Sequence, residues 1–220
     1  MTTAQDTLAT SQGPVEIVPI HHETLLLRVA GKAIYLDPIK DGTYDALPKA
    51  THIFLTDIHS DHLDPSTIER LRTPTTVLIG PQAVADKLQG VTVIRNGESR
   101  SLDGFTVDAV PMYNLQRGPA PGELFHDKGR GNGYVFTFGD KRVYVSGDTE
   151  CTPEMRELKN IDVAFLCMNL PYTMPPAEAA ECVKAFRPAV VYPYHFRGSD
   201  PNELKNSVGA ASEVRVRTWY

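Results

Sequence analysis

Three acids and two histidines are crowded together directly after an apolar run. The stretch FLTDIHSDHLDP, residues 54–65, holds them at Asp57, His59, Asp61, His62 and Asp64. Imidazole nitrogens and carboxylate oxygens are donors that suit zinc, and carboxylates also suit harder ions such as manganese. Asp57, His59 and Asp61 alternate with other residues, so an extended turn would direct their side chains to one side. The stretch therefore predicts a metal site.

A solvated loop that caps a helix is the simpler alternative for the same residues. Asp64 fits that role, because Pro65 follows it and proline suits the first position of a helix. Asp61 and His62 fit it less well, because Asp148 and His195 supply further candidate ligands elsewhere in the chain.

Polar residues also end several of the expected strands. Such residues gather at one edge of a sheet, where a rigid frame can build a binding site. They are Asp37 after AIYL, Asp57 after HIFLT, Asn114 after VDAVPMY, Asp148 after VYVSG and His195 after VVYPY. The pattern indicates one shared site.

Short runs rich in β-branched residues, bounded by Gly, Pro, Asn or Asp, dominate the chain and predict strands. The expected strands cover residues 15–20, 24–29, 33–37, 52–56, 76–80, 91–95, 105–113, 133–138, 142–147, 162–167, 189–195 and 213–219, and the expected helices 65–71, 81–88, 176–186 and 201–207. Turns at Gly31-Lys32 and Gly139-Asp140 indicate antiparallel hairpins. Many strands interspersed with helices indicate an α/β (α+β) fold of two mixed sheets flanked by helices.

The length of 220 residues suits a single domain over residues 15–220, preceded by a flexible tail over residues 1–14. A net charge of −5 argues against nucleic acid as a partner, since nucleic-acid surfaces are normally basic. The expected partner is a small-molecule substrate, and the oligomeric state is open.

The sequence leaves the compartment open. No stretch approaches the roughly 20 apolar residues of a membrane-spanning helix, and the polar N-terminus lacks the regions of a signal peptide. We therefore expect a soluble protein of the cytoplasm, or of the periplasm if a signal peptide has been removed.

Three cysteines, Cys151, Cys167 and Cys182, are widely spaced along the chain. Their odd number and spacing predict neither a disulfide framework nor a cysteine-based zinc site. Cys167 lies in an expected strand and Cys182 in an expected helix, so both are interpreted as small buried apolar side chains.

The motif residues together resemble the metallo-β-lactamase superfamily. The family motif H-x-H-x-D-H, followed by a distant His, a distant Asp and a final His, compares here with DIHSDH, SGDTE and YPYHF. The resemblance extends over essentially the whole chain and implies a four-layer αββα sandwich. It also implies a metal site kept by Asp61, His62, Asp148 and His195, with Asp37 supporting it.

Two positions depart from the family motif. Asp57 stands where the first histidine is expected, and Asn114 stands at the mid-chain histidine position, which leaves His59 as the only histidine of the first metal site. We therefore expect one tightly bound zinc, with manganese or a second, weaker metal as alternatives. Asp57 is then a ligand, an orienter of His59, or a general base.

Further segments indicate one branch of this superfamily. DHLDP, VPMYN and HDKGRGNGYVFTFGDKRVYVSGDTE are similar to the lactonase-like branch, which includes ascorbate-6-phosphate lactonases and phospholipase-D-type hydrolases. Glyoxalase II and the zinc ribonucleases would keep the first histidine, and flavodiiron proteins would place Glu within the cluster.

Other residues are candidates for proton transfer or substrate contact. His126 is either a ligand or proton donor at the metal pocket, or a surface-loop histidine. Tyr172 and Arg197 follow expected strands at the same edge, and each is interpreted as a substrate contact or a packing residue. Arg130, among glycines, is a weak candidate for a phosphate contact.

The resemblance implies a metal-dependent hydrolase, because a bound metal lowers the pKa of water and polarises the bond under attack. The expected bond is an ester, lactone or phosphodiester of a small molecule. The candidate catalytic residues are Asp57, Asp148 and His126, and the candidate ligands are Asp57, His59, Asp61, His62, Asp148 and His195. A non-catalytic metal-binding protein is the alternative, and the acidic charge disfavours a nuclease.

Overall fold

Two seven-stranded sheets face each other in the computed structural model, which describes residues 6–220. The first sheet has the order β1 (Asp6–Leu8), β2 (Val15–His21), β3 (Thr24–Val29), β4 (Lys32–Leu36), β5 (His52–Phe54), β6 (Val77–Gly80) and β7 (Val91–Val93). The second has the order β14 (Glu213–Val214), β13 (Val190–Tyr194), β12 (Val163–Cys167), β11 (Lys141–Val145), β10 (Gly131–Phe138), β9 (Phe105–Met112) and β8 (Ser99–Leu102).

Both sheets are mixed, as the sequence predicts. In the first sheet β1 to β4 pair antiparallel and β4 to β7 pair parallel. In the second sheet β8 to β11 pair antiparallel and β11 to β14 pair parallel. The parallel strands place their carboxyl ends at a common edge of each sheet, which is where loops can build a site.

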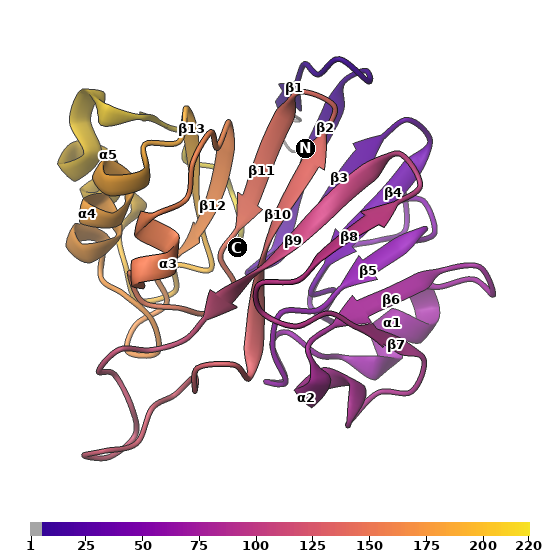
Figure 1. Ribbon diagram of the computed structural model, residues 1–220, viewed down its shortest axis with the longest axis horizontal. Coiled ribbons are helices and arrows are strands. Elements are labelled where there is room, and N and C mark those ends of the chain that lie inside the picture. Colours follow the sequence, from indigo (N-terminus) through magenta and orange to yellow (C-terminus); the bar gives the residue numbers. More distant parts are fainter. Residues whose placement is uncertain (1–5) are drawn as a thin grey trace.

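Helices cover the outer face of each sheet (Figure 1). The first sheet carries α1 (Pro65–Leu71) and α2 (Gln82–Ala85); the second carries α3 (Pro153–Arg156), α4 (Pro176–Phe186), α5 (Pro201–Val208) and the 3₁₀ turn η1 (Gly209–Ala211). The predicted apolar stripe of α4, including Ala179, Val183 and Phe186, is buried. The predicted four-layer αββα sandwich is confirmed.

The space between the sheets is filled by apolar side chains from both of them. Phe54 of β5, for example, packs edge-on against Tyr134 and Phe136 of β10, with ring centroids 5.2 and 4.8 Å apart. Such aromatic pairs contribute about 0.5–1.5 kcal/mol each beyond the area that they bury. This packing gives the loops at the sheet edges a rigid base.

Helix α1 begins where the sequence predicts. Asp64 is its N-cap, and its carboxylate accepts hydrogen bonds from the backbone N–H groups of Ser66 and Thr67 at 3.0 and 3.4 Å. Asp64 is therefore committed to the helix and lies outside the candidate metal ligands.

Some sequence-based boundaries are wrong. The expected flexible tail over residues 1–14 contains strand β1. Asp6 of this strand accepts hydrogen bonds from Tyr192 and Arg217. Residues 1–5 lie outside the described part of the chain. The expected strand over residues 213–219 ends at Val214, and α2 ends at Ala85. The sequence also missed β8 and α3, both of which are only four residues long.

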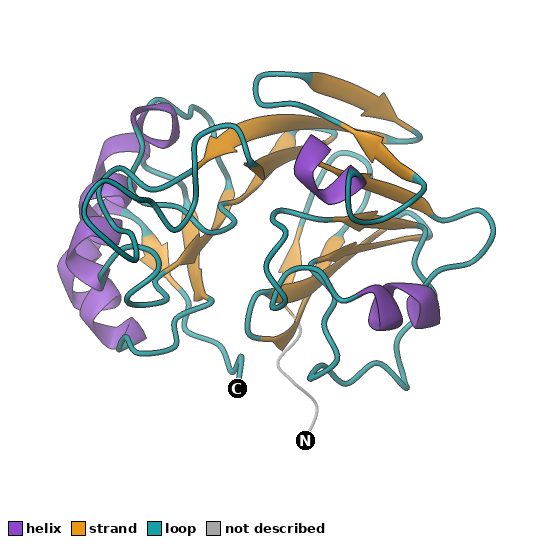
Figure 2. Cartoon of the chain, turned by 90° about the horizontal axis from the view of Figure 1, so that it is seen from below, coloured by secondary structure: helices purple, strands orange, loops and turns teal. Residues whose placement is uncertain are grey.

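The candidate residues follow strands whose carboxyl ends lie at one edge. Strand β11 runs toward the lower side of Figure 1, and the view from below in Figure 2 shows loops gathered between the two halves. None of the helices within residues 6–220 has the length and apolar character needed to span a bilayer.

Candidate metal centre

Three imidazole rings converge on the carboxylate of Asp148, which follows β11. The Oδ2 atom of Asp148 lies 3.3 Å from His126 Nε2 and 3.4 Å from His62 Nε2. Its Oδ1 atom lies 2.8 Å from His195 Nδ1. All four residues are buried, although they come from distant parts of the chain.

The facing atoms of this group have the properties of metal ligands. Among the described residues, none forms a hydrogen bond with His62 Nε2, His126 Nε2, His195 Nδ1 or Asp148 Oδ1. Buried polar atoms normally have hydrogen-bond partners, so four unpaired atoms in one place require an explanation. Ligands held about 2.0–2.1 Å from a tetrahedral metal lie about 3.3 Å from one another. The observed spacing and the nitrogen and oxygen donors therefore fit a divalent metal.

Charge around Asp148 also favours a cation. Burial pushes the pKa of the Asp148 carboxyl upward, but His195 and His62 outweigh burial and hold that pKa well below its usual range. Burial lowers the pKa of His62, but Asp148 and Asp37 outweigh burial and hold it well above its usual range. Both directions mean that positive charge is stabilised between these groups.

Asp37 orients His62. Its Oδ2 atom lies 2.9 Å from His62 Nδ1, and its Oδ1 atom accepts a hydrogen bond from the backbone N–H of Thr56 at 2.8 Å. A carboxylate on one ring nitrogen fixes the ring so that the other nitrogen faces a metal. The structure thus places Asp37 behind the ligands, where the sequence puts a supporting acid.

His126 supplies the mid-chain histidine that the sequence assigns to Asn114. Asn114 Oδ1 accepts hydrogen bonds from the backbone N–H of His126 at 2.9 Å and from its Nδ1 at 2.6 Å. The Nε2 atom of His126 is then directed toward Asp148. Asp57, His59 and His126 lie close enough together to share one ion. His126 therefore adds a second histidine to the group around Asp57, where the sequence predicts His59 alone.

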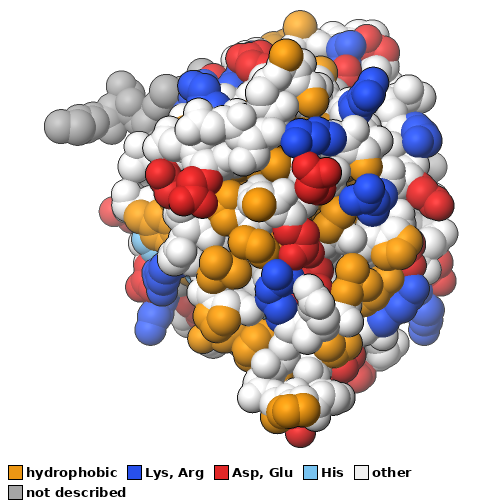
Figure 3. Space-filling view, turned by 90° about the vertical axis from the view of Figure 1, so that its left-hand side faces the viewer, with side chains coloured by type: hydrophobic (Ala, Val, Ile, Leu, Met, Phe, Trp, Pro, Cys, Tyr) orange, Lys and Arg blue, Asp and Glu red, His pale blue; other side chains and the backbone are white. Residues whose placement is uncertain are grey.

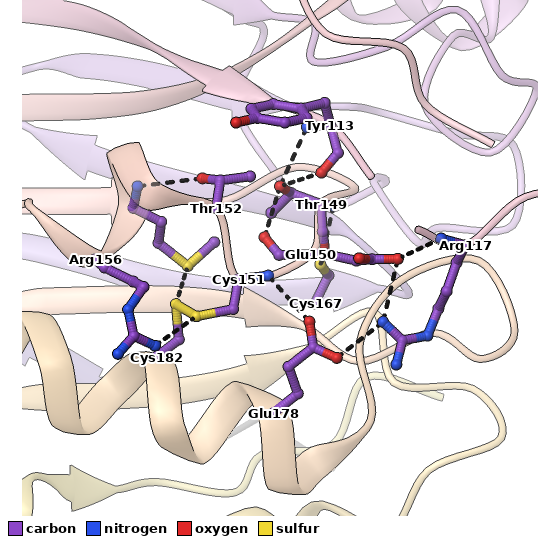
Figure 4. The surroundings of a disulfide bond; sticks show 11 residues. Tyr113, Arg117, Thr149, Glu150, Cys151, Thr152, Arg156, Cys167, Glu178 and Cys182 are labelled. Carbon is purple, nitrogen blue, oxygen red and sulfur yellow. Dashed lines mark hydrogen bonds and ion pairs between the residues drawn. A yellow bond between two sulfur atoms is a disulfide. The ribbon is translucent and has the colours of Figure 1, made fainter. Parts of the chain in front are cut away.

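The segment that leads to His126 is held by Glu150, a residue that the sequence did not single out. The buried carboxylate of Glu150 accepts hydrogen bonds from the backbone N–H groups of Leu115, Gln116 and Arg117 at 3.0, 3.2 and 2.9 Å. It also accepts a hydrogen bond from Asn114 Nδ2 at 3.1 Å. Figure 4 shows the Arg117 guanidinium between Glu150 and Glu178, 3.1 and 2.8 Å from their carboxylates.

A disulfide joins Cys151, beyond Asp148, to Cys182 of α4 (Figure 4). The interpretation of Cys182 as only a buried apolar side chain is therefore wrong. The two residues are separated by 31 positions, and folding brings their Cα atoms to 5.6 Å, which sequence spacing does not reveal. Cys167 is free and buried, as predicted.

Asp57 is fully buried and paired on both carboxylate oxygens. Arg130 donates to Oδ1 through Nε at 3.1 Å and to Oδ2 through Nη2 at 3.0 Å, and His59 Nδ1 lies 2.8 Å from Oδ2. Burial raises the pKa of Asp57, but His59, His62 and Arg130 outweigh burial and lower it. Asp57 therefore stays a carboxylate, and Arg130 is engaged with it.

Asp61 lies on the other side of His195 from Asp148. Its Oδ2 atom is 3.7 Å from His195 Nε2 and 3.6 Å from the Nε2 atom of His22. His22 and Glu23, which the sequence missed, complete this group. The sequence did carry a signal for them, because the run HHE at residues 21–23 follows the apolar strand 15–20 just as the other site residues follow their strands.

Backbone geometry marks the same region. His22, Asp37 and His195 have φ angles of 56°, 42° and 46°, in the left-handed region that residues with a Cβ seldom adopt. Such conformations cluster at functional sites, because the surrounding structure must hold them in place.

A cavity of about 660 Å³ opens beside these groups. The residues that line it include His59, His126, Asp148, Tyr172 and Arg197. The ring of Tyr172 is 45% exposed and packs edge-on against Phe125 at 5.0 Å. The two predicted substrate contacts thus line the same cavity as the candidate ligands.

Known proteins resemble this chain in sequence and structure. The family model described as the beta-lactamase superfamily domain matches residues 16–195. A UPF0173 metal-dependent hydrolase of Symbiobacterium thermophilum is 33% identical over 74% of this chain and 73% of its own length. One of Thermococcus onnurineus is 29% identical over 86% of this chain and 90% of its own length.

Two solved structures extend the comparison. A protein of Parabacteroides distasonis, inferred to be a metal-dependent hydrolase, superposes with a TM-score of 0.92 at 37% identity over 98% of both chains. Igni18, a metallo hydrolase of Ignicoccus hospitalis, superposes with a TM-score of 0.76 at 26% identity, over 92% of this chain and 94% of its own. The chain therefore belongs to the beta-lactamase superfamily, among metal-dependent hydrolases of the metallo-β-lactamase fold.

Proposed function

We propose that this metal-dependent hydrolase holds two adjoining metal ions and hydrolyses an ester, lactone or phosphodiester bond of a small molecule. The observation that carries the proposal is the convergence of unpaired nitrogens from His62, His126 and His195 on the buried carboxylate of Asp148, beside an open cavity. The resemblance to the lactonase-like branch supports the choice of bonds.

The ligands fall into two sets. Asp57, His59 and His126 form one, and His62, Asp148 and His195 form the other. Asp148 Oδ2 faces both His126 and His62, so Asp148 would contribute to holding both ions. Zinc is the proposed metal, with manganese as the alternative.

The second histidine of the first set changes the expected metal content. The expectation of one tight zinc rested on a first site with a single histidine, whereas His126 gives that site two. A bound divalent cation supplies an acidified water and withdraws electron density from the bond under attack.

Asp57 is better suited to ligand or orienting chemistry than to proton abstraction. A general base must take up a proton, whereas the Arg130 guanidinium beside both oxygens of Asp57 favours the ionised carboxylate. An Asp57→Asn variant separates the roles: loss of rate with metal retained supports the base, and loss of metal supports the ligand.

The cavity rim favours a substrate with an anionic group. Arg197 lines the cavity and forms no ion pair with any acid among residues 6–220. Its guanidinium packs 5.6 Å from the ring centre of Tyr220, which leaves its donors for a carboxylate or phosphate.

We expect chelation to abolish hydrolysis of the preferred substrate, and added zinc or manganese to restore it. The test is a panel of lactones, carboxylic esters and phosphodiesters, each assayed before chelation, after chelation and after the metal is returned. Neutral analogues of each anionic substrate serve as matched controls for the role of Arg197.

Absence of turnover across the whole panel, with metal bound, would favour the non-catalytic alternative. A nuclease is disfavoured by the net charge of −5. On the face shown in Figure 3, lysines and arginines are interspersed with acids. Cleavage of RNA or DNA in preference to the small molecules would contradict the proposed substrate class.

A further inference from the structure

Four apolar or aromatic side chains line the cavity beside the candidate ligands. They are Phe125, Leu170, Pro171 and Tyr172. Phe125 directly precedes the candidate ligand His126, and the other three lie between β12 and α4. The rings of Phe125 and Tyr172 pack edge-on with their centres 5.0 Å apart, so the two segments meet at this contact. We call these four side chains the apolar wall.

The Tyr172 ring is open to the cavity although it is large and aromatic. Within residues 6–220, Leu115 and Tyr220 are the only other large hydrophobic residues that are similarly exposed. Single exposed apolar residues are common on protein surfaces. Tyr172 differs from them because it lines a concave cavity together with other apolar side chains and a few polar groups, which is the usual composition of a small-molecule pocket. The wall is therefore a surface on which a substrate can pack.

Hydrogen bonds hold the apolar wall in place. The backbone carbonyl of Tyr172 accepts a hydrogen bond from Asn114 Nδ2 at 2.9 Å, and the same asparagine holds His126. The backbone N–H of Tyr172 donates to the carbonyl of Asn169 at 2.9 Å, and the Asn169 side chain is hydrogen-bonded to His195 at 2.8 Å. The wall is thus fixed relative to candidate ligands at both of its ends. A surface formed in advance loses little entropy when it binds a ligand.

The rest of the cavity lining is polar. It includes the candidate ligands His59, His126 and Asp148, and among the described residues that line the cavity Arg197 is the only lysine or arginine. Displacing water from apolar surface is favourable, so an apolar group gains by packing on the wall. A molecule that fills the cavity therefore combines a polar reacting group at the metal ligands with an apolar group on the wall.

We propose that the substrate carries an acyl or alkyl chain that packs on the apolar wall while its scissile bond lies at the metal centre. This inference rests on the proposed hydrolysis and narrows its substrate class. Tyr172 is then a specificity-determining residue, because its ring contacts the chain and takes no part in bond cleavage. Substrates without a chain leave the wall uncovered, so the protein selects against them.

Calorimetric titration of the zinc-loaded wild-type protein with sodium octanoate and with sodium acetate tests the wall without turnover. Both probes offer the same carboxylate to the metal centre and to Arg197, and only octanoate has a chain long enough to cover the wall. Octanoate is expected to bind with a Kd at least about tenfold lower than that of acetate, and with a more negative heat-capacity change. Equal Kd values for the two carboxylates would overturn the proposal.

Tyr172→Ala is expected to reduce the difference between the two Kd values to about threefold or less, because it removes the exposed ring of the wall. Tyr172→Phe keeps the ring and is expected to keep the difference. Leu115→Ala is the matched control, because Leu115 is 49% exposed and does not line the cavity. An unchanged difference in Tyr172→Ala would contradict the assignment, and should that variant not fold, Leu170→Ala on the same wall takes its place.

Hydrolysis of substrate pairs that differ only in chain length separates this inference from the proposed function. The pairs are ethyl acetate and ethyl hexanoate, γ-valerolactone and γ-nonalactone, and dimethyl and methyl hexyl phosphate, assayed by proton release. In the pair that is hydrolysed, the longer member is expected to have a kcat/KM about tenfold or more higher, and Tyr172→Ala to narrow that ratio. Equal kcat/KM values for both members would contradict the chain-binding role and leave the proposed hydrolysis intact. Absence of turnover in every pair would contradict the proposed hydrolysis, and the carboxylate titration would still decide whether the wall binds a chain.

Discussion

Replacing Asp148 by asparagine is expected to lower kcat/KM about 10³-fold or more. Within residues 6–220, Asp148 is the one carboxylate that faces His62, His126 and His195 together, so its loss weakens both proposed metal positions. Metal activation contributes several kcal/mol of transition-state stabilisation, and about 4 kcal/mol corresponds to roughly a thousandfold in rate. Asparagine has the same shape, so the fold should persist.

The comparison is made with zinc restored and with metal content measured on the same samples. Asp108→Asn is the matched control, because Asp108 lies on β9, where it accepts hydrogen bonds from Ser99 and Arg142. This variant is expected to keep the wild-type rate. An Asp148→Asn enzyme that retains both its metal and a rate within tenfold of wild type would show that Asp148 does not hold the two ions.

Replacing Arg130 by alanine is expected to destabilise the protein by about 2–3 kcal/mol. The change leaves the fully buried Asp57 carboxylate without the guanidinium that pairs with both its oxygens. Breaking a fully buried pair costs about 3–5 kcal/mol, and the 20% exposure of the Arg130 side chain reduces that figure. Thermal unfolding after chelation should show a Tm lower by roughly 5–10 °C.

Arg72→Ala is the matched control for that measurement. Arg72 forms an ion pair with Glu69 on the exposed surface of α1, and such pairs contribute about 0–1 kcal/mol. Equal Tm shifts for the two variants would mean that the Asp57–Arg130 pair does not stabilise the site.

The sequence predicts well the parts of the fold and site that regular strands position. Asp37, Asp148 and His195 each follow a buried apolar strand, so their common edge could be inferred from the strand pattern. The short edge strands β1 and β8 were missed because their residues are mostly polar and partly exposed, which leaves no apolar alternation to detect.

Residues that depend on irregular backbone were harder to place. His126 reaches Asp148 because Glu150 and Asn114 hold the segment between β9 and β10 through hydrogen bonds. The sequence of that segment has no periodicity from which those hydrogen bonds could be predicted. His22 and Glu23 follow an apolar strand as other site residues do, but the positive φ of His22 could not be read from the sequence. The Cys151–Cys182 disulfide depends in the same way on α4 packing beside the segment after β11.

The proposed two-metal centre does not require the first motif histidine. Asp57 takes the place of that histidine, and Arg130 keeps it ionised inside the protein. His126 faces Asp148 from the other side, and its ring centre lies 5.0 Å from that of His59. Two histidines and a carboxylate are a sufficient donor set for zinc when water or substrate completes the coordination.

The metal content of the purified protein tests the two-metal centre most directly. After exhaustive dialysis, elemental analysis is expected to give two zinc or manganese ions per wild-type chain and at most one in a His126→Asn variant. One ion or fewer in the wild type, or an unchanged count in the variant, would contradict a centre built from His126 and Asp148.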